Sequence, residues 1–132
     1  MADRVLVDTS AWIEFFRREG SPVSLRLRES LKLDRACYAG PIAVELFQGA
    51  KTNKEIQVID HLLETIQYIE ITRIHYHHAG LISQKAARSG KVFSVVDIVL
   101  AVVAHDEQLS LLSLDSHFPE IANFCPFYLE GL

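Results

Sequence analysis

Residues 92–115 read VFSVVDIVLAVVAHDEQLSLLSLD, and this stretch decides the fold class. Residues 94–105 are almost uniformly apolar around a helical circumference, which predicts a helix buried on all sides. Residues 109–114 form a short apolar run, which is typical of a buried strand. A buried helix that leads directly into a buried strand is the repeating unit of an α/β protein.

The rest of the chain alternates in the same way. Capping residues, prolines and glycines predict helices that begin at Thr9, at Ser21-Pro22, at Gly40-Pro41, at Asn53 as a cap, and at Thr72. Further short strands are expected at residues 4–7, 36–39, 68–71 and 124–129. Strands separated by helices imply a mostly parallel central sheet flanked by helices on both faces. We therefore expect an α/β fold in a single domain over residues 1–132.

Composition excludes several classes of protein. The chain is 49% hydrophobic and 23% charged, which suits a globular domain with a real core. It has no apolar run near the roughly 20 residues that span a bilayer, and its N-terminus does not resemble a signal peptide. Two cysteines make a disulfide scaffold improbable, so we expect a cytoplasmic protein without a membrane partner.

The net charge of -4 argues against a simple nucleic-acid-binding protein. The basic residues are nevertheless unevenly distributed. Most of them lie between Arg17 and Lys54. This segment is either a solvated helical surface or a basic rim beside an acidic site. Eight of the thirteen fall in this one segment: Arg17, Arg18, Arg26, Arg28, Lys32, Arg35, Lys51 and Lys54.

Asp97 lies within the apolar helix predicted at residues 94–105. An ionised carboxylate among apolar side chains is unfavourable unless it is paired or binds a metal. Ser94 and Asp97 also fit the S-x-x-D pattern of a capping box, which places an acid at a helix start for stability alone. Both interpretations can hold, because the first turn of a helix can also face a crevice.

Three more acids stand at element ends or beside apolar stripes. Asp8 directly follows the first predicted strand, and Asp115 follows the strand at residues 109–114. Because ligands bind at the carboxyl ends of parallel strands, we expect Asp8 and Asp115 at one edge of the sheet. Glu45 lies near an apolar stripe of its helix. Taken singly, the three are explained as a helix cap, a turn residue and a surface glutamate.

Together the four acids predict a site for a hard divalent cation, Mg²⁺ or Mn²⁺, which carboxylate oxygens suit. Such an ion activates water and stabilises charge during phosphodiester cleavage. No serine-based catalytic triad is evident in the sequence.

Four motifs, VDTSAWIEFF, VELFQG, SVVDIVLAVVA and LLSLDSHF, occur in the order and approximate spacing found in PIN-domain ribonucleases. Over about residues 5–118, the chain most resembles the VapC-type toxins of bacterial and archaeal toxin–antitoxin pairs. The resemblance implies a PIN-like three-layer sandwich and metal-dependent hydrolysis of RNA. It also implies a homodimer within a larger assembly. The VapB-type antitoxin there would wrap the toxin with its C-terminal segment and bind DNA with its N-terminal part.

Residue by residue, Asp8, Glu45, Asp97 and Asp115 match the metal-binding acids of that family. Ser10 stands where the family has a small hydroxyl residue beside the first acid, which implies a supporting role. One position departs from the pattern: members often carry a second acid in the last motif, where this chain has His117.

Other features have less specific interpretations. His75 and His78 would share a helix face, but no third zinc ligand is placed by the sequence, so we interpret them as part of a solvated face. Trp12, Phe15 and Phe16 are at helical spacing and predict core or interface positions rather than base stacking.

Two rival functions remain open. A phospho-acceptor signalling domain would need an acidic pair near the first strand and a lysine after a late strand, and this chain shows neither. A noncatalytic PIN-like binding module would typically lack one or more of the acids.

Overall fold

The computed structural model describes residues 3–131, and these residues build one parallel sheet of five strands covered by seven helices. The strands are β1 (Val5–Val7), β2 (Ala36–Ala39), β3 (Gln67–Ile69), β4 (Ser110–Leu112) and β5 (Tyr128–Leu129). The helices are α1 (Thr9–Arg17), α2 (Pro22–Lys32), α3 (Gly40–Gly49), α4 (Asn53–Thr65), α5 (Arg73–Arg88), α6 (Val95–Asp106) and α7 (His117–Ile121).

The sheet has the strand order β3-β2-β1-β4-β5, and every pairing is parallel. The central strands are short and apolar because both of their faces are covered. Val5, Leu6 and Val7 are completely buried, as are Leu111 and Leu112 on the neighbouring strand. This confirms the α/β class and the parallel sheet predicted from the sequence.

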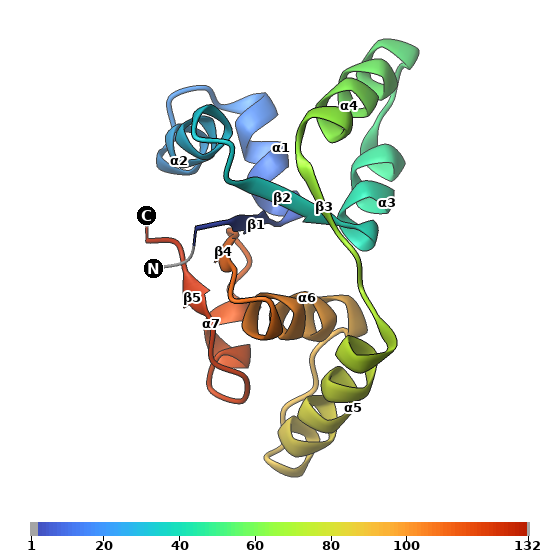
Figure 1. Cartoon of the computed structure of the whole chain (residues 1–132), viewed down its shortest axis with the longest axis vertical. Helices are drawn as coiled ribbons and strands as arrows, with labels where there is room; N and C mark the ends of the chain where they lie inside the picture. Colours follow the sequence, from blue (N-terminus) through green and yellow to red (C-terminus); the bar gives the residue numbers. More distant parts are fainter. Residues whose placement is uncertain (1–2, 132) are drawn as a thin grey trace.

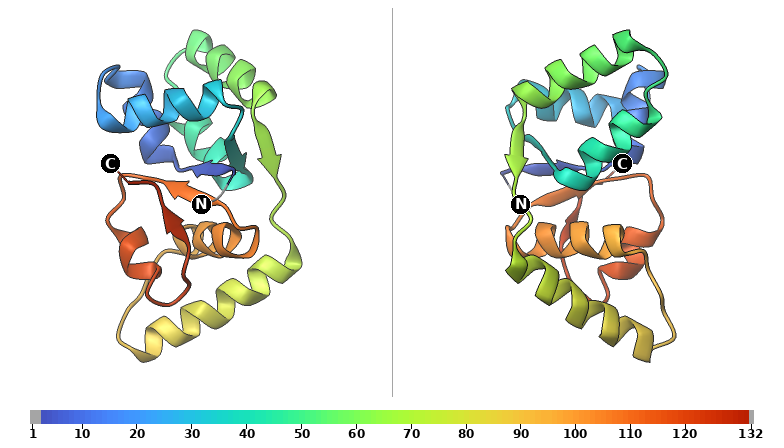
Figure 2. Two further views of the ribbon diagram at one scale, coloured as in Figure 1. Left: turned by 60° about the vertical axis from the view of Figure 1, so that its left-hand side comes forward. Right: turned by 90° about the vertical axis from the view of Figure 1, so that its right-hand side faces the viewer.

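Helices cover both faces of the sheet. Figures 1 and 2 show α1, α2, α3 and α4 on one side, and α5, α6 and α7 on the other. The connections from β1 to β2 to β3 run outward in one direction, and the chain then returns to place β4 on the other side of β1. Because such crossovers are right-handed, reversing direction moves the helices to the opposite face. The strand order therefore switches between β1 and β4, which is where open α/β sheets bind ligands.

Helix α6 is the buried helix predicted from residues 94–105. Its residues from Ile98 to Ala104 are all buried. Ser94 is its N-cap, and the Ser94 hydroxyl accepts a hydrogen bond from the Asp97 backbone N–H at 3.1 Å. The first turn of α6, with Asp97, consequently has a fixed position beside the sheet.

Several predicted helix boundaries are confirmed. Ser21 caps α2, with proline at the first helical position. Gly90 ends α5 with a φ of +79°, a conformation that glycine adopts without steric penalty. One prediction was wrong: the cap of α4 is Thr52 rather than Asn53. Thr52 forms a full capping box with Glu55, and this satisfies two backbone N–H groups.

The structure departs from the sequence prediction most clearly in three segments. The last strand, β5, spans only Tyr128–Leu129 and not residues 124–129. Strand β3 spans Gln67–Ile69 rather than residues 68–71, since it ends where its pairing with β2 ends. Helix α7 was not predicted, because five residues are too few to show a helical period. Phe118 and Ile121, one turn apart, are completely buried and hold this short helix against the core.

The cysteines, the membrane-spanning potential of the helices and His75 were also considered in the sequence analysis. Cys37 and Cys125 are both free thiols in the core. No helix within residues 3–131 is long and apolar enough to cross a membrane. His75, however, is not on a solvated face: it is buried, and its Nε2 lies 3.1 Å from the Glu107 carboxylate at the end of α6. Packing of α5 against α6 covers a side chain that its own helix would expose.

Candidate metal centre

Three of the four predicted acids gather where the strand order switches. Asp8 follows β1 and caps α1 with its backbone, and its N–H donates to the Leu112 carbonyl at 3.0 Å. The pairing of β1 with β4 thus continues up to the first acid. Asp115 follows β4, and Asp97 comes from the first turn of α6. The sequence prediction that Asp8 and Asp115 share one edge of the sheet is confirmed.

Asp8 is held in place by hydroxyl groups. Its side chain is almost fully buried, and its Oδ2 accepts hydrogen bonds from Ser10 at 3.0 Å and from Ser113 at 2.9 Å. The backbone N–H groups of Leu114 and Asp115 donate to those same two hydroxyls. The Ser10 hydroxyl therefore orients the Asp8 carboxylate, and it also orders the segment after β4.

Asp97 is in an environment that disfavours its charge. Burial raises the pKa of the Asp97 carboxyl, the nearby Asp115 and Asp8 raise it further, and hydrogen bonds from Ser94 and His117 partly offset the rise. An unpaired cluster of carboxylates behaves in this way because like charges repel in a poorly solvated site. A bound cation would remove that repulsion.

Asp115 and His117 contact each other next to Asp97. The His117 backbone N–H donates to Asp115 Oδ1 at 2.9 Å. The imidazole Nδ1 of His117 lies 3.2 Å from Asp115 Oδ1 and 3.4 Å from Asp97 Oδ2. Within residues 3–131, these three residues form the group of metal-ligating side chains whose donor atoms all lie within 4.8 Å of one another.

Glu45 lies apart from that group. It is exposed on α3, and its Oε1 accepts a hydrogen bond from the Thr9 hydroxyl at 2.7 Å. Since Thr9 directly follows Asp8, this bond ties Glu45 to the first acid. The structure thus brings Asp97 and Asp115 together, places Asp8 beside them, and connects Glu45 to them through α1.

Sequence reasoning missed three residues of this arrangement. Thr9 and Ser113 are small hydroxyl residues next to strand ends, which is a common pattern with no specific meaning. His117 was noted only as a departure from a family pattern, and its place two residues after Asp115 is the signal that could have pointed to the site. A pair of oxygen and nitrogen ligands at that spacing can reach one ion when a turn joins them.

The donor set fits a divalent cation. Carboxylate oxygens are the preferred ligands of Mg²⁺ and Mn²⁺, and an imidazole nitrogen is accepted by first-row transition ions. Burial and the neighbouring acids raise the pKa of Asp97, and a bound cation would favour its ionised form. The residues present are therefore able to hold a metal ion.

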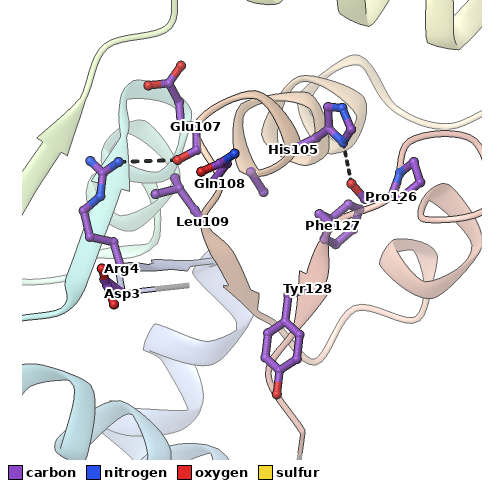
Figure 3. Close-up of a pocket in the computed structure, with 10 residues that line it drawn as sticks. Asp3, Arg4, His105, Glu107, Gln108, Leu109, Pro126, Phe127 and Tyr128 are labelled. Carbon is purple, nitrogen blue, oxygen red and sulfur yellow. Dashed lines mark hydrogen bonds between the residues drawn. The ribbon is translucent and has the colours of Figure 1, made fainter. Parts of the chain in front are cut away.

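The hollow in Figure 3 lies at the opposite edge of the sheet. It has a volume of about 520 Å³, and it is lined by residues at or before the amino ends of β1, β4 and β5, among them Arg4, Leu109 and Tyr128. Its polar groups bond to the chain itself: Arg4 donates to the Glu107 carbonyl, and the His105 ring contacts the Pro126 carbonyl. Ligands of parallel sheets bind at the other edge, so we assign this hollow no catalytic role.

Comparison with known proteins agrees with this geometry. The PIN domain family model matches residues 5–123, a span that contains all four acids. The chain belongs to the PIN-domain family. The match covers the whole sheet except β5. Membership of the PIN-domain family replaces the interpretation of the chain as a phospho-acceptor signalling domain.

This PIN domain has relatives among VapC ribonucleases. It is 30% identical over 122 residues to VapC ribonuclease Mb1587 of Mycobacterium bovis, covering 89% of this chain and 91% of the relative. It is 25% identical over 114 residues to ribonuclease VapC2 of Haemophilus influenzae, covering 83% of this chain and 85% of that protein. A DNA-bound VapBC structure from Salmonella typhimurium has the same fold, with a TM-score of 0.78 at 18% identity over 96% of each chain.

Proposed function

We propose that this PIN domain is a metal-dependent endoribonuclease and the toxin of a VapBC-type toxin–antitoxin pair. The observation that carries the proposal is the group formed by Asp97, Asp115 and His117, with Asp8 beside it, at the strand switch of a PIN fold. The names of its relatives among VapC ribonucleases support the same activity.

In this proposal, Asp8, Glu45, Asp97 and Asp115 form the site for Mg²⁺ or Mn²⁺. When bound, the ion promotes ionisation of water and offsets negative charge on the scissile phosphate. The Ser10 and Ser113 hydroxyls fix the orientation of the Asp8 carboxylate, which would hold the ion.

Glu45 has a different position in the site. It is exposed and bonded to Thr9, which leaves its second carboxylate oxygen available for a water molecule. Its proposed role is to accept a proton from the attacking water.

Basic residues next to Glu45 fit an RNA substrate. Arg17 and Lys54 line one groove together with Glu45, between α1, α3 and α4. Cations at this place would neutralise phosphates beside the scissile bond, although the whole chain is acidic. Arg18 and Arg28 instead pair with glutamates of their own surface. Only part of the basic segment therefore fits the basic rim considered from the sequence.

The same groove supports an antitoxin partner. It has a volume of about 370 Å³, and its floor is apolar, with Ile13, Phe16 and Val58 all exposed by more than a third. Several solved structures with this fold are VapBC or other toxin–antitoxin complexes. We propose that an amphipathic segment of a VapB-type antitoxin lays its apolar face in this groove and covers the path to Glu45.

Trp12, which the sequence left as a core or interface residue, does not belong to this interface. Trp12, Val23 and Leu27 are in the core, with 0–2% of each residue exposed. They cannot contact a partner, because α1 and α2 pack against each other and against the sheet. The exposed Phe16 and Ile13 carry the apolar surface of α1 instead.

The deciding experiment is cleavage of a defined single-stranded RNA by the purified protein. We expect cleavage with Mg²⁺ or Mn²⁺ and none in excess EDTA. Asp115→Asn should abolish it, whereas Asp60→Asn, a change of an exposed carboxylate on α4, should not. RNA binding without cleavage under all metal conditions would instead favour the noncatalytic PIN-like module. Undiminished cleavage in EDTA would disprove the metal requirement.

A further inference from the structure

The imidazole of His117 lies within the acidic site. Its imidazole Nδ1 points between two carboxylates that come from different elements, Asp97 on α6 and Asp115 after β4. Roughly half of the His117 side chain is exposed, so an ion and its water ligands can reach the ring. The question is whether the three donor atoms suit one ion.

Their spacing does suit one ion. Adjacent ligands on an octahedral ion with bonds of 2.0–2.1 Å are separated by about 3.0 Å. The Nδ1 of His117 is 3.2 Å from one carboxylate oxygen and 3.4 Å from the other. Small adjustments of side-chain torsions would bring all three atoms to bonding distance of a common centre.

The position of the ring is fixed by its surroundings. The backbone N–H of His117 is bonded to Asp115, and the next residue, Phe118, is completely buried. The ring of Phe93 packs edge-on against the imidazole, with 6.4 Å between the ring centroids. The nitrogen is therefore held beside the carboxylates at little further loss of conformational entropy.

We propose that His117 is a metal ligand of this site, and that it shifts the preference of the site from Mg²⁺ toward Mn²⁺ and other first-row transition ions. This inference rests on the proposed metal-dependent function and specifies its ion. Mg²⁺ favours oxygen ligands and retains its water, whereas Mn²⁺, Co²⁺ and Zn²⁺ accept imidazole nitrogen readily. A site with one nitrogen ligand should therefore discriminate against Mg²⁺ more strongly than a site of four carboxylates would.

A competing explanation is that His117 only neutralises its two carboxylates as an imidazolium ion. In that arrangement its nitrogen would carry a proton toward them and would have to move away when a cation binds. The two explanations differ in whether the metal–nitrogen bond exists, and a spectroscopic measurement on the metal-loaded protein tests that bond directly.

The experiment uses the full chain freed of metal and then loaded with Mn²⁺ alone. Electron spin echo envelope modulation of bound Mn²⁺ should show coupling to an imidazole nitrogen. The coupling should vanish in His117→Ala and His117→Asp. It should persist in His77→Ala, a matched change of an exposed histidine on α5. Absence of nitrogen coupling in the parent would overturn the inference.

Calorimetric titration with Mn²⁺ and with Mg²⁺ provides the second measurement. The ratio of the two affinities should be roughly tenfold larger in the parent than in His117→Asp, which restores an all-oxygen set. An unchanged ratio would also overturn the inference. If the parent binds Mn²⁺ without nitrogen coupling and Asp115→Asn does not bind it, only the role of His117 fails. If the parent binds neither ion, the proposed function fails with it.

Discussion

Asp97 serves two purposes that the sequence left as alternatives. Its backbone N–H is the group capped by Ser94, and its carboxylate faces Asp115 and His117. The cap uses the backbone N–H of Asp97, while the Asp97 carboxyl also hydrogen-bonds with Ser94. Burial and the neighbouring acids raise the pKa of this carboxyl, so the folded protein holds its proton more tightly than the unfolded chain does. In the absence of metal, this carboxyl makes the free energy of unfolding fall as pH rises from about 4 through the raised pKa.

Asp97→Asn should separate chemistry from stability. We expect cleavage to fall by about 100-fold or more, since one of the proposed metal ligands is lost. The metal-free variant should be as stable as the parent or more stable by up to about 1 kcal/mol, because repulsion among the acids is relieved. The rise in melting temperature on adding Mg²⁺ or Mn²⁺ should shrink.

Thermal melts across a metal titration, measured alongside RNA cleavage, check this prediction, with Asp60→Asn as the matched control. If metal raised the melting temperature of parent and Asp97→Asn equally and both were equally active, Asp97 would be purely structural.

The two thiols should be inert in the folded protein. Burial raises the pKa of Cys37 to about 12 and that of Cys125 to about 11, so neither forms a thiolate near neutral pH. At pH 8 we expect no reaction with Ellman's reagent in native buffer and reaction of both thiols in denaturant. Because unfolded thiols ionise near pH 8.5, stability should also fall as pH rises above that value. Rapid labelling of the native protein would show that the segments around these thiols open locally.

At the scale of elements, the start of α6 determines where Asp97 lies in the site. The helix is buried from Ile98 to Ala104, about two turns, and its first turn is the part that reaches the site. The Ser94 cap fixes where that turn begins. Ser21 caps α2 in the same way, through the Ser24 backbone N–H at 3.2 Å, but at a place without any of the acids.

The two caps form a matched pair for mutation. Ser94→Ala and Ser21→Ala should each lower the free energy of unfolding by about 1 kcal/mol. Only Ser94→Ala should also reduce metal-dependent cleavage, by roughly tenfold, because it loosens the turn that positions Asp97. Denaturant titration and cleavage assays on both variants test this expectation. Equal activity of the two variants would mean that the cap does not position the acid.

At the scale of the whole molecule, the acidic site and the apolar groove are neighbouring but separate surfaces. The acids lie at the carboxyl edge between β1 and β4, and the groove of α1, α3 and α4 adjoins them through Glu45. A partner bound in that groove could therefore control access to the site without contacting the buried Asp8. This arrangement agrees with the proposed relationship of toxin and antitoxin.

Phe16→Asp should weaken antitoxin binding by about 30-fold or more, as expected when an apolar anchor is lost from an interface. The added carboxylate should also weaken RNA binding, because Phe16 lines the same groove as Arg17 and Lys54. Leu81→Asp, which changes an exposed leucine of α5 on the other side of the sheet, is the matched control. Binding titrations with the cognate antitoxin measure both effects. Equal affinity of parent and Phe16→Asp would place the interface elsewhere.

The sequence by itself determined the alternation of elements and much of their placement. The strand at Ala36–Ala39 and the helix that follows Ser94 could be predicted because apolar periodicity and capping are local properties. Asp8 and Asp115 could be assigned to one edge because each directly follows a parallel strand.

Only the tertiary structure decided which side chains meet across large separations in sequence. Asp97 and His117 come together because α6 and α7 pack on the same side of the sheet. Ser113 holds Asp8 because β4 pairs with β1, and Glu45 is bonded to Thr9 because α3 lies beside α1. Periodicity shows which face of an element is apolar but not which element covers it, and this is why His75 proved to be buried and Phe16 exposed.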